Sequence, residues 1–338
     1  MEHHKNFSLK DFNTFGIDVS AKAFVSVSSV EELKEVLQQV YAHELFILGG
    51  GSNILLLKNI DQTILHINLK GRALEREDEN YAYVRAQAGE NWHEFVRWCI
   101  AHDFGGLENL SLIPGNVGTS PIQNIGAYGV ELKDSFVSCE AIHKQTLQTK
   151  IFTKEECNFG YRNSTFKNEN KDKFIISSVL FRLTKKEHQL HTGYGAILAE
   201  LKKENIENPS IEDISDAIIS IRKSKLPDPK ELGNSGSFFK NPIISKAAYD
   251  KLIKKFPKMP SYTISTNEIK IPAGWLIEQA GFKGCRKEDA GVHKNQALVL
   301  VNYGNATGED IYALAEEIQK KIWDVFEIHL EMEVNVIS

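Results

Sequence analysis

Apolar and polar positions in the first part of the chain alternate between strand-like and helix-like patterns. The segment SSVEELKEVLQQV has the apolar period of a helix, with Ser28 or Ser29 as its N-cap and an acidic residue three positions later. Short runs around it are typical of strands, namely residues 23–27, 45–50, 54–57 and 63–69. We therefore expect a small α+β unit over residues 1–69.

In the next part of the chain, strand signals flank one clear helix. Residues 81–89 alternate as a half-buried strand does, and residues 174–184 form an apolar, strand-like run. Residues 91–104 have a helical period that places five side chains on one face: Trp92, Phe95, Val96, Cys99 and Ile100. The charged stretch 201–213 indicates a connector, so we expect a second unit over residues 70–217.

The last part of the chain predicts a third unit over residues 218–326, followed by a final strand over residues 327–338. Helical patterns and one apolar strand define this unit, at residues 244–256, 273–282, 308–326 (with Thr307 as the cap) and 296–302. The ending IHLEMEVNVI alternates as a strand, which puts Glu331 and Glu333 on the same face. The pattern alone therefore does not distinguish these two acids.

Composition places the chain among soluble globular proteins. It has 338 residues, 42% hydrophobic and 25% charged, with a net charge of −5, which suits two or three domains. No basic block indicates nucleic acid or a membrane surface. No run approaches the roughly 20 apolar residues of a membrane span, and the start lacks the apolar stretch of a signal peptide. Four scattered cysteines predict free thiols in a cytoplasmic protein, and the histidines have no metal-binding spacing.

Two glycine-rich segments are candidates for binding a phosphate-bearing cofactor. In LGGGSN (48–53), glycines after an apolar strand allow a turn with exposed N–H groups. The alternative is a plain turn, and the absence of GxGxxG disfavours a nicotinamide-binding Rossmann fold. The longer run GGLENLSLIPGNVGTSPIQNIGAYGVE (105–131) suits close approach of the backbone to a flat cofactor. The alternative there is a structural Ω-loop anchored by its own apolar side chains.

Three further stretches carry candidate reactive side chains. Arg162 in YRNSTFK suits a developing enolate or carboxylate, although a lone arginine is more often part of a surface ion pair. In GNSGSFFKNP (233–242) a tight turn delivers Ser237 onto a segment anchored by two phenylalanines; the alternative is a turn serine. His293 and Gln296 stand at the entry of an apolar strand, where they could face a site or cap a loop.

Seven motifs in order resemble one family: LGGGSN, IPGNVGTSPIQNIGAYGVE, YRNSTFK, KLPDP, GNSGSFFKNP, AGWLIEQAGFKG and HKNQALVLVN. They are similar to the UDP-N-acetylenolpyruvoylglucosamine reductase family of peptidoglycan precursor synthesis. The resemblance runs from about Asn13 to Glu333, and the TGYG segment (192–195) resembles the family's first type. One departure is Met332, where many relatives have proline.

The resemblance implies a three-lobed flavoprotein with the FAD-binding fold of the vanillyl-alcohol-oxidase group and a C-terminal substrate domain. It implies non-covalent FAD, NADPH as hydride donor, and UDP-N-acetylglucosamine enolpyruvate as substrate. Hydride would pass from flavin N5 to the enol-ether methylene carbon, and a serine would protonate the neighbouring carbon. We expect a cytoplasmic monomer that binds neither nucleic acid nor membrane.

The resemblance also assigns roles to residues. The catalytic residues would be Ser237, Arg162 and, on the returning C-terminal strand, Glu333. The substrate contacts would be Tyr194, Lys225, Asn241 and Gln296. The cofactor-binding residues would be Gly49, Gly50, Gly51, Ser52, Asn53, Pro114, Gly115, Val117, Gly118, Thr119, Ser120, Gln123, Asn124, Gly126, Ala127 and Tyr128.

Two other functions compete with this hypothesis. A flavin-dependent oxidase of the same fold would use oxygen as acceptor, and many such enzymes attach FAD covalently. A non-catalytic sugar-nucleotide-binding module would have lost its catalytic positions, yet Ser237, Arg162 and Glu333 are all present.

Overall fold

The computed structural model describes residues 2–338, except for the side chains at positions 2, 3 and 195. The chain forms two compact units. The first unit contains the chain up to Phe7 together with Ala21–Gly50 and Asp61–Ser224. The second unit contains Ser8–Ser20, Gly51–Ile60 and Lys225–Ser338. The limits of the four segments expected from the sequence remain a prediction about domain organisation.

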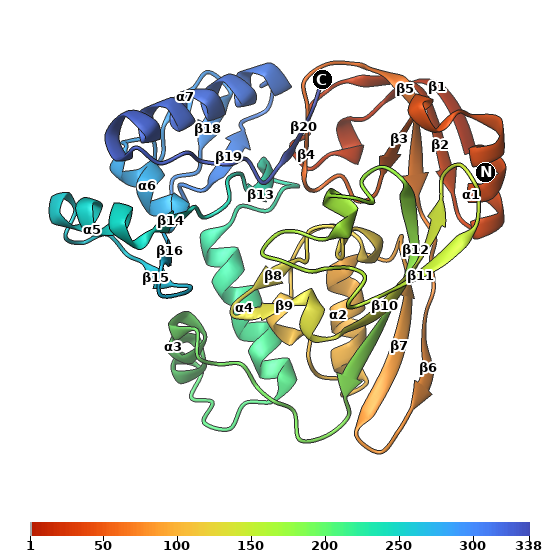
Figure 1. Cartoon of the computed structure of the whole chain (residues 1–338), viewed down its shortest axis with the longest axis horizontal. Helices are drawn as coiled ribbons and strands as arrows, with labels where there is room; N and C mark the ends of the chain where they lie inside the picture. The colour runs from red at the N-terminus through yellow and green to blue at the C-terminus, as the bar shows by residue number, and fades with distance from the viewer. Residues whose placement is uncertain (1) are drawn as a thin grey trace. The chain divides into compact units, whose positions relative to one another are not determined.

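The N-terminal part of the first unit is a four-stranded sheet with one helix against it (Figure 1). The strand order is β1 (Glu2–Ser8), β2 (Ser20–Val27), β5 (Ile60–Ile67) and β3 (Leu45–Leu48). Helix α1 (Val30–Gln39) begins at Ser29, whose side chain accepts a hydrogen bond from the Glu32 amide at 3.1 Å. The predicted helix and its cap are thereby confirmed, because this bond satisfies an otherwise unpaired N–H of the first turn.

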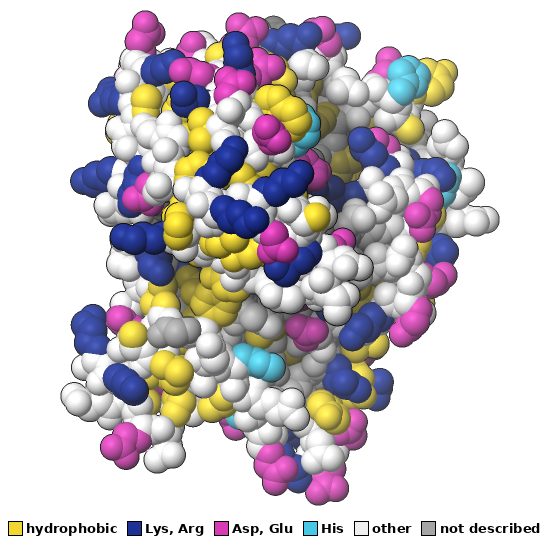
Figure 2. All heavy atoms as spheres, turned by 60° about the vertical axis from the view of Figure 1, so that its left-hand side comes forward, with side chains coloured by type: hydrophobic (Ala, Val, Ile, Leu, Met, Phe, Trp, Pro, Cys, Tyr) yellow, Lys and Arg dark blue, Asp and Glu magenta, His cyan; other side chains and the backbone are white. Residues whose placement is uncertain are grey.

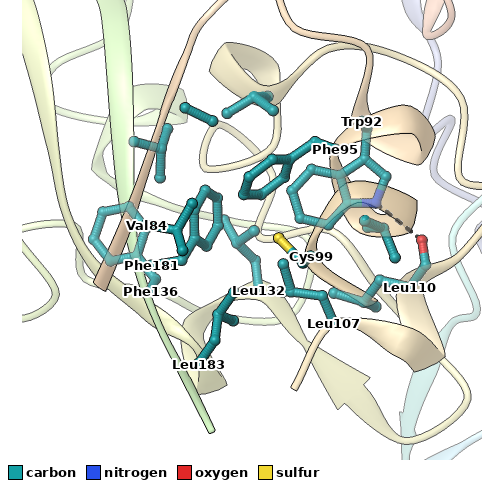
Figure 3. Packing of buried hydrophobic residues seen from close by; sticks show 14 of the residues in the cluster. Val84, Trp92, Phe95, Cys99, Leu107, Leu110, Leu132, Phe136, Phe181 and Leu183 are labelled. Carbon is teal, nitrogen blue, oxygen red and sulfur yellow. Dashed lines mark hydrogen bonds between the residues drawn. The ribbon is translucent and has the colours of Figure 1, made fainter. Parts of the chain in front are cut away.

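A five-stranded antiparallel sheet forms the rest of the first unit's framework. Its order is β11 (Thr149–Thr153), β10 (Phe136–His143), β12 (Phe174–Thr184), β7 (Tyr81–Gln87) and β6 (Arg72–Glu77). Helix α2 (Trp92–Ala101) buries the face that the sequence predicts, and Figure 3 shows Trp92, Phe95 and Cys99 among the core side chains. The Trp92 indole donates a hydrogen bond to the Leu110 carbonyl at 2.9 Å.

The glycine-rich run 105–131 is ordered by this core. Leu107, Leu110 and Val117 are buried, and Figure 3 shows Leu107 and Leu110 among the packed side chains. Ile122, another apolar residue of the run, is 37% exposed. The run contains only short elements, namely η3 (Glu108–Leu110), η4 (Val117–Thr119), β8 (Gly126–Ala127) and β9 (Val130–Glu131).

Two helices complete the first unit around a small core of their own. They are α3 (Gly195–Lys203) and α4 (Ile211–Lys225), and their isoleucine and leucine side chains pack together. The stretch 201–213, expected to be a connector, contains the end of α3 and the start of α4. Only residues 204–210 join the two helices, because the apolar period of each helix extends into the charged stretch.

The second unit is built on small antiparallel sheets and three helices. One sheet has the order β13 (Gly233–Ser237), β19 (Val299–Asn302), β18 (Ala290–Val292) and β17 (Arg286–Lys287). Another has the order β14 (Ile243–Ser245), β16 (Glu268–Lys270) and β15 (Tyr262–Thr263). The helices are α5 (Lys246–Lys255), α6 (Ala273–Gln279) and α7 (Gly308–Phe326), the last with Thr307 and Asp310 in a capping box.

The C-terminal segment differs from its predicted form. A strand over 328–337 was expected, but only β20 (Asn335–Ile337) is regular, and it pairs in parallel with β4 (Ile54–Leu56). Before it, Met332 forms a single bridge with Phe239. The segment therefore changes pairing partner partway, which alternation of side chains in the sequence does not reveal.

Charged side chains of both signs cover the face drawn in Figure 2. The four cysteines are free, as predicted, and three of them are buried. Among the described helices, none has the length and apolar content needed to cross a membrane.

Candidate active site

Ser237 lies at the exposed end of an anchored turn in the second unit. Gly236 has φ +69°, a conformation that favours glycine, and its amide donates to the Asn234 side chain at 2.9 Å. The pairing of β13 with β19 is irregular between Asn234 and Ser237. Phe238 and Phe239 follow and are fully buried, whereas Ser237 is exposed. The turn therefore presents the hydroxyl outward on a rigid support.

Glu333 lies on the C-terminal segment next to this turn. Its amide donates to the Phe238 carbonyl at 2.8 Å, and the Lys240 amide donates to the Glu331 carbonyl at 2.9 Å. The Glu331 side chain is 71% exposed and forms an ion pair with Lys240. Glu333 is only partly exposed. The two acids that the sequence pattern left equivalent therefore differ in their exposure to solvent.

Arg162 lies in the first unit and contacts the end of the glycine-rich run. Its guanidinium donates to the Gly126 carbonyl at 2.6 Å. A Cβ at Gly126 would lie 3.1 Å from the guanidinium, so the glycine leaves room for this approach. Arg162 has φ +51°, a strained backbone conformation for a non-glycine residue. The bond to Gly126 and the backbone conformation of Arg162 therefore hold the guanidinium in place.

The two glycine-rich segments pack closely within the first unit. A Cβ at Gly49 would lie 2.7 Å from the Thr119 side chain, and one at Gly50 would lie 3.0 Å from the Gly115 Cα. A Cβ at Gly118 would lie 2.4 Å from that of Ala88. Residues 49–50 and 115–119 therefore form one backbone-lined surface, as a cofactor that approaches the main chain requires.

Several polar residues expected at the cofactor hold the loop together. The Ser120 hydroxyl donates to the Val117 carbonyl at 2.6 Å. The fully buried Asn124 donates to Gly160 and Glu131, both at 3.1 Å. The amides of residues 117–120 all donate to carbonyls of the same unit. These side chains and amides hold the loop in shape. A ligand would therefore contact the run mainly through atoms of the run that are not already hydrogen-bonded.

The remaining predicted positions are distributed over both units. Tyr194 is 49% exposed, and its ring lies 5.7 Å from that of Tyr128 in an edge-on arrangement. Lys225 ends α4 and is exposed. Pro114 is exposed, and Gln123 and Ala127 are partly exposed along the run.

In the second unit, Asn241 and Gln296 are partly exposed and use one side-chain oxygen internally. The Asn241 oxygen accepts from the Ala273 amide at 2.8 Å, at the start of α6. The Gln296 oxygen accepts from the Leu298 amide at 3.4 Å.

Residues 51–53 also belong to the second unit. A Cβ at Gly51 would lie 2.0 Å from the Phe12 carbonyl, and the Asn53 side chain donates to the Glu333 carbonyl at 3.2 Å. Ser52 lies between them in sequence and is partly exposed.

Arg222 is a candidate that the sequence analysis missed. Its Nε is buried and has no hydrogen-bond partner within residues 2–338, and the guanidinium hydrogen-bonds Tyr128. Burial lowers the pKa of Arg222, and the contact with Tyr128 opposes this shift. Burial raises the pKa of Tyr128. The sequence signal for this residue is its helical spacing. Arg222 follows the buried Ile218 by four positions, which places it on the same face of α4.

Two hydroxyls in the second unit are also buried without a partner among the described residues. They belong to Thr14 and Ser235, and the Thr14 carbonyl accepts from the Asn234 amide at 2.9 Å. An unpaired buried polar group costs about 1–3 kcal/mol, so such groups at glycine-rich segments favour a bound ligand. Within the first unit, the closely packed glycine-rich segments 49–50 and 115–119 fit a flat, phosphate-bearing cofactor such as FAD.

Comparison with known families agrees with this interpretation. Residues 21–146 match the FAD binding domain, which confirms the expected flavin-binding architecture. Residues 228–337 match the C-terminal domain of UDP-N-acetylenolpyruvoylglucosamine reductase. The predicted α+β fold with a distinct C-terminal domain is therefore confirmed.

Whole-chain relatives extend the similarity. The UDP-N-acetylenolpyruvoylglucosamine reductase of Flavobacterium johnsoniae is 62% identical and covers 100% of both chains. That of Pseudomonas putida is 46% identical over 99% of both chains. The crystal structure of the Thermus caldophilus enzyme superposes with a TM-score of 0.69 at 24% identity, covering 100% of this chain and 98% of that one. The chain belongs to the UDP-N-acetylenolpyruvoylglucosamine reductase family of FAD-dependent oxidoreductases.

Proposed function

We propose that this enzyme reduces UDP-N-acetylglucosamine enolpyruvate to UDP-N-acetylmuramate with NADPH, for the synthesis of peptidoglycan precursors. The 62% identity to a relative named for this reductase activity supports the proposal. The observation that carries it is Ser237, an exposed residue on an anchored turn next to Glu333, in the part of the chain that matches the C-terminal domain of this reductase.

When bound, FAD supplies the redox chemistry by accepting a hydride from NADPH and delivering it to the methylene carbon of the enolpyruvyl group. Arg162 and Glu333 assist at the enolate that hydride addition would leave. A fixed charge or donor at such an oxygen contributes roughly 3–4 kcal/mol to the stability of the transition state. The guanidinium of Arg162 suits this role because it is always charged and is held by Gly126.

Ser237 provides the proton for the carbon next to the methylene. A serine hydroxyl is a weak acid, so it acts as a relay only where water is excluded and charge is close. The peptide contact between Phe238 and Glu333 supports this assignment, because it puts a carboxylate on the neighbouring segment.

Four residues would bind the sugar nucleotide. Lys225 offers a positive charge to the diphosphate or carboxylate, and Asn241 and Gln296 offer side-chain N–H donors. Their oxygens already accept hydrogen bonds from Ala273 and Leu298, so the amide nitrogens are the groups directed to a ligand. Tyr194 would cover the substrate.

We further propose that the protein acts in the cytoplasm as a monomer. The glycine-rich residues 49–53 and 114–128 would contact FAD through groups other than the Ser120 and Asn124 side chains and the amides of residues 117–120, because these are already hydrogen-bonded within the first unit.

The deciding experiment is anaerobic stopped-flow spectroscopy of the purified holoenzyme. NADPH is used to reduce the flavin, the enolpyruvyl sugar nucleotide is then added, and the flavin absorbance is followed. Rapid reoxidation by the sugar nucleotide is expected. Slow reoxidation by the sugar nucleotide with fast reoxidation by air would instead favour the oxidase alternative.

A further inference from the structure

The segment that carries Tyr194 is held along its length. Residues 185–194, here named the tyrosine segment, join β12 to α3. His188 contacts the Thr184 hydroxyl at 2.6 Å and the Asp103 carboxylate at 3.1 Å. Leu190 packs against two of the hydrophobic clusters of the first unit. The segment is therefore fixed at its start and middle before it reaches Tyr194.

Asn109 supplies the last attachment before Tyr194. Its side-chain nitrogen donates to the His191 carbonyl at 2.9 Å and to the Tyr128 carbonyl at 3.1 Å. Only the nitrogen of an amide side chain can face two carbonyl oxygens, so this geometry also fixes the orientation of the amide. One side chain thus ties the tyrosine segment to the glycine-rich run.

The position of Asn109 is costly, which argues for a specific role. The side chain is only 1% exposed, and its oxygen is buried with no partner in the described part of the chain. A buried acceptor left unpaired costs about 1–3 kcal/mol. The two donated bonds, rather than general stability, are therefore what this residue contributes.

Tyr128 completes the link between Asn109 and Tyr194. Asn109 holds the main chain of Tyr128, whose φ is +50°. The Tyr128 ring packs edge-on against that of Tyr194 at 5.7 Å, and its hydroxyl is bound by Arg222. Asn109 therefore fixes the backbone on both sides of the contact between the two rings.

We propose that Asn109 is a positioning residue that sets Tyr194 for the sugar nucleotide, a role that rests on the proposed function. Without its two hydrogen bonds, residues 191–194 and the main chain of Tyr128 would be less ordered before the substrate binds, and completing that order on binding would reduce affinity. Asn109 acts through Tyr194 and does not itself contact the substrate.

The test is a double-mutant cycle on the oxidised holoenzyme. The dissociation constant of the enolpyruvyl sugar nucleotide is measured by flavin absorbance in the wild type, Asn109→Ala, Tyr194→Ala and the double variant. Asn109→Ala should weaken binding roughly 10-fold in the wild-type background and less than about 2-fold in the Tyr194→Ala background. An equal effect in both backgrounds, or no effect in either, would overturn the proposal.

A conservative variant guards against simple loss of folding. In Asn109→Asp the carboxylate cannot donate, but its protonated form can donate one of the two bonds. Burial among carbonyls raises the pKa of such an acid, so the binding defect of Asn109→Asp should shrink as the pH falls. That of Asn109→Ala should not. Identical pH profiles for the two variants would contradict the role.

A matched control and a readout without substrate separate this proposal from the proposed function. Gln62→Ala removes another amide-to-carbonyl bond of the first unit, to His43 at 2.8 Å, and should leave binding unchanged. Hydrogen exchange in residues 185–194 should accelerate in Asn109→Ala only, and unchanged exchange would count against the clamp. Failure of the wild type to bind the sugar nucleotide would overturn the proposed function, and this role with it.

Discussion

The turn at 233–239 and the run at 105–131 are both glycine-rich, yet each contains a serine in the opposite setting. In the turn, Ser237 is exposed and the two residues that follow it, Phe238 and Phe239, are buried. In the run, Ser120 and Asn124 are buried and bonded to the loop itself.

The difference follows from how the backbone is supported in each segment. In the short turn the backbone is supported by its neighbours, so a side chain is available for chemistry. In the long run, main-chain bonds satisfy part of the backbone, and the Ser120 and Asn124 side chains bond further carbonyls. A serine in the first setting is a candidate reagent, whereas a serine in the second is a structural part.

The strongest prediction compares these two serines. Ser237→Ala should slow reoxidation of reduced flavin by the sugar nucleotide roughly 10²–10⁴-fold, the usual contribution of a positioned proton donor. Flavin reduction by NADPH should change little. Stopped-flow measurement of the two half-reactions tests this, and equal slowing of both would remove the role of Ser237.

Ser120→Ala is the control for this comparison. It should cost about 1 kcal/mol of unfolding free energy, the net value of one hydrogen bond, and any change in rate should affect both half-reactions alike, because this hydroxyl is bonded within the loop.

The second prediction concerns the close packing of the run. Gly118→Ala places a Cβ 2.4 Å from that of Ala88, so we expect a loss of about 1–3 kcal/mol from overpacking together with a lower FAD content. Denaturant unfolding and flavin absorbance measure the two effects. Adding Ala88→Gly should restore part of the loss, and no recovery would show that the clash is not the cause.

The third prediction concerns the short turn. Gly236 has φ +69° and no heavy atom within 4 Å of an added Cβ, so Gly236→Ala introduces backbone strain without a clash. We expect a loss of about 1–2 kcal/mol in unfolding free energy. Gly236→Asn should cost less, because asparagine tolerates this conformation better. Equal losses for both variants would contradict the explanation from backbone strain.

The smallest expected effect is a pH dependence of the unfolding free energy, through the contact between His93 and the run. The His93 ring accepts a hydrogen bond from the Leu112 amide at 3.0 Å, and burial lowers the pKa of His93, with the Arg97 charge adding to the effect. A lowered pKa means that protonation favours the unfolded state. The stabilisation is therefore present above the ordinary histidine pKa of about 6.5 and is lost as the pH falls toward the folded-state pKa.

Unfolding free energy measured between pH 7 and pH 5 should therefore fall, with part of the slope due to His93. His93→Gln keeps an acceptor that does not titrate. The slope of unfolding free energy against pH should therefore decrease, by less than about 1.4 kcal/mol per pH unit. Burial also lowers the pKa values of His66 and His293, so some slope should remain. An unchanged slope in the variant would exclude His93 as a contributor.

Much of this molecule was determined by the sequence alone. The caps at Ser29 and Thr307 and the buried face of α2 follow from local pattern, because a helix repeats its environment every few residues. The family and its FAD-dependent chemistry also followed from ordered motifs that span nearly the whole chain. The catalytic assignments themselves remain proposals.

Other features were decided only by the tertiary structure. Glu331 and Glu333 differ in exposure, because the Glu331 side chain is 71% exposed and Glu333 is only partly exposed. Arg222 is distinguished from nearby surface cations by the packing of Tyr128 against α4. Asn109 donates hydrogen bonds to Tyr128 and His191, which lie 19 and 82 positions further along the chain. The physical reason is common to all three: burial and hydrogen-bond partners come from segments distant in sequence, so no local pattern encodes them.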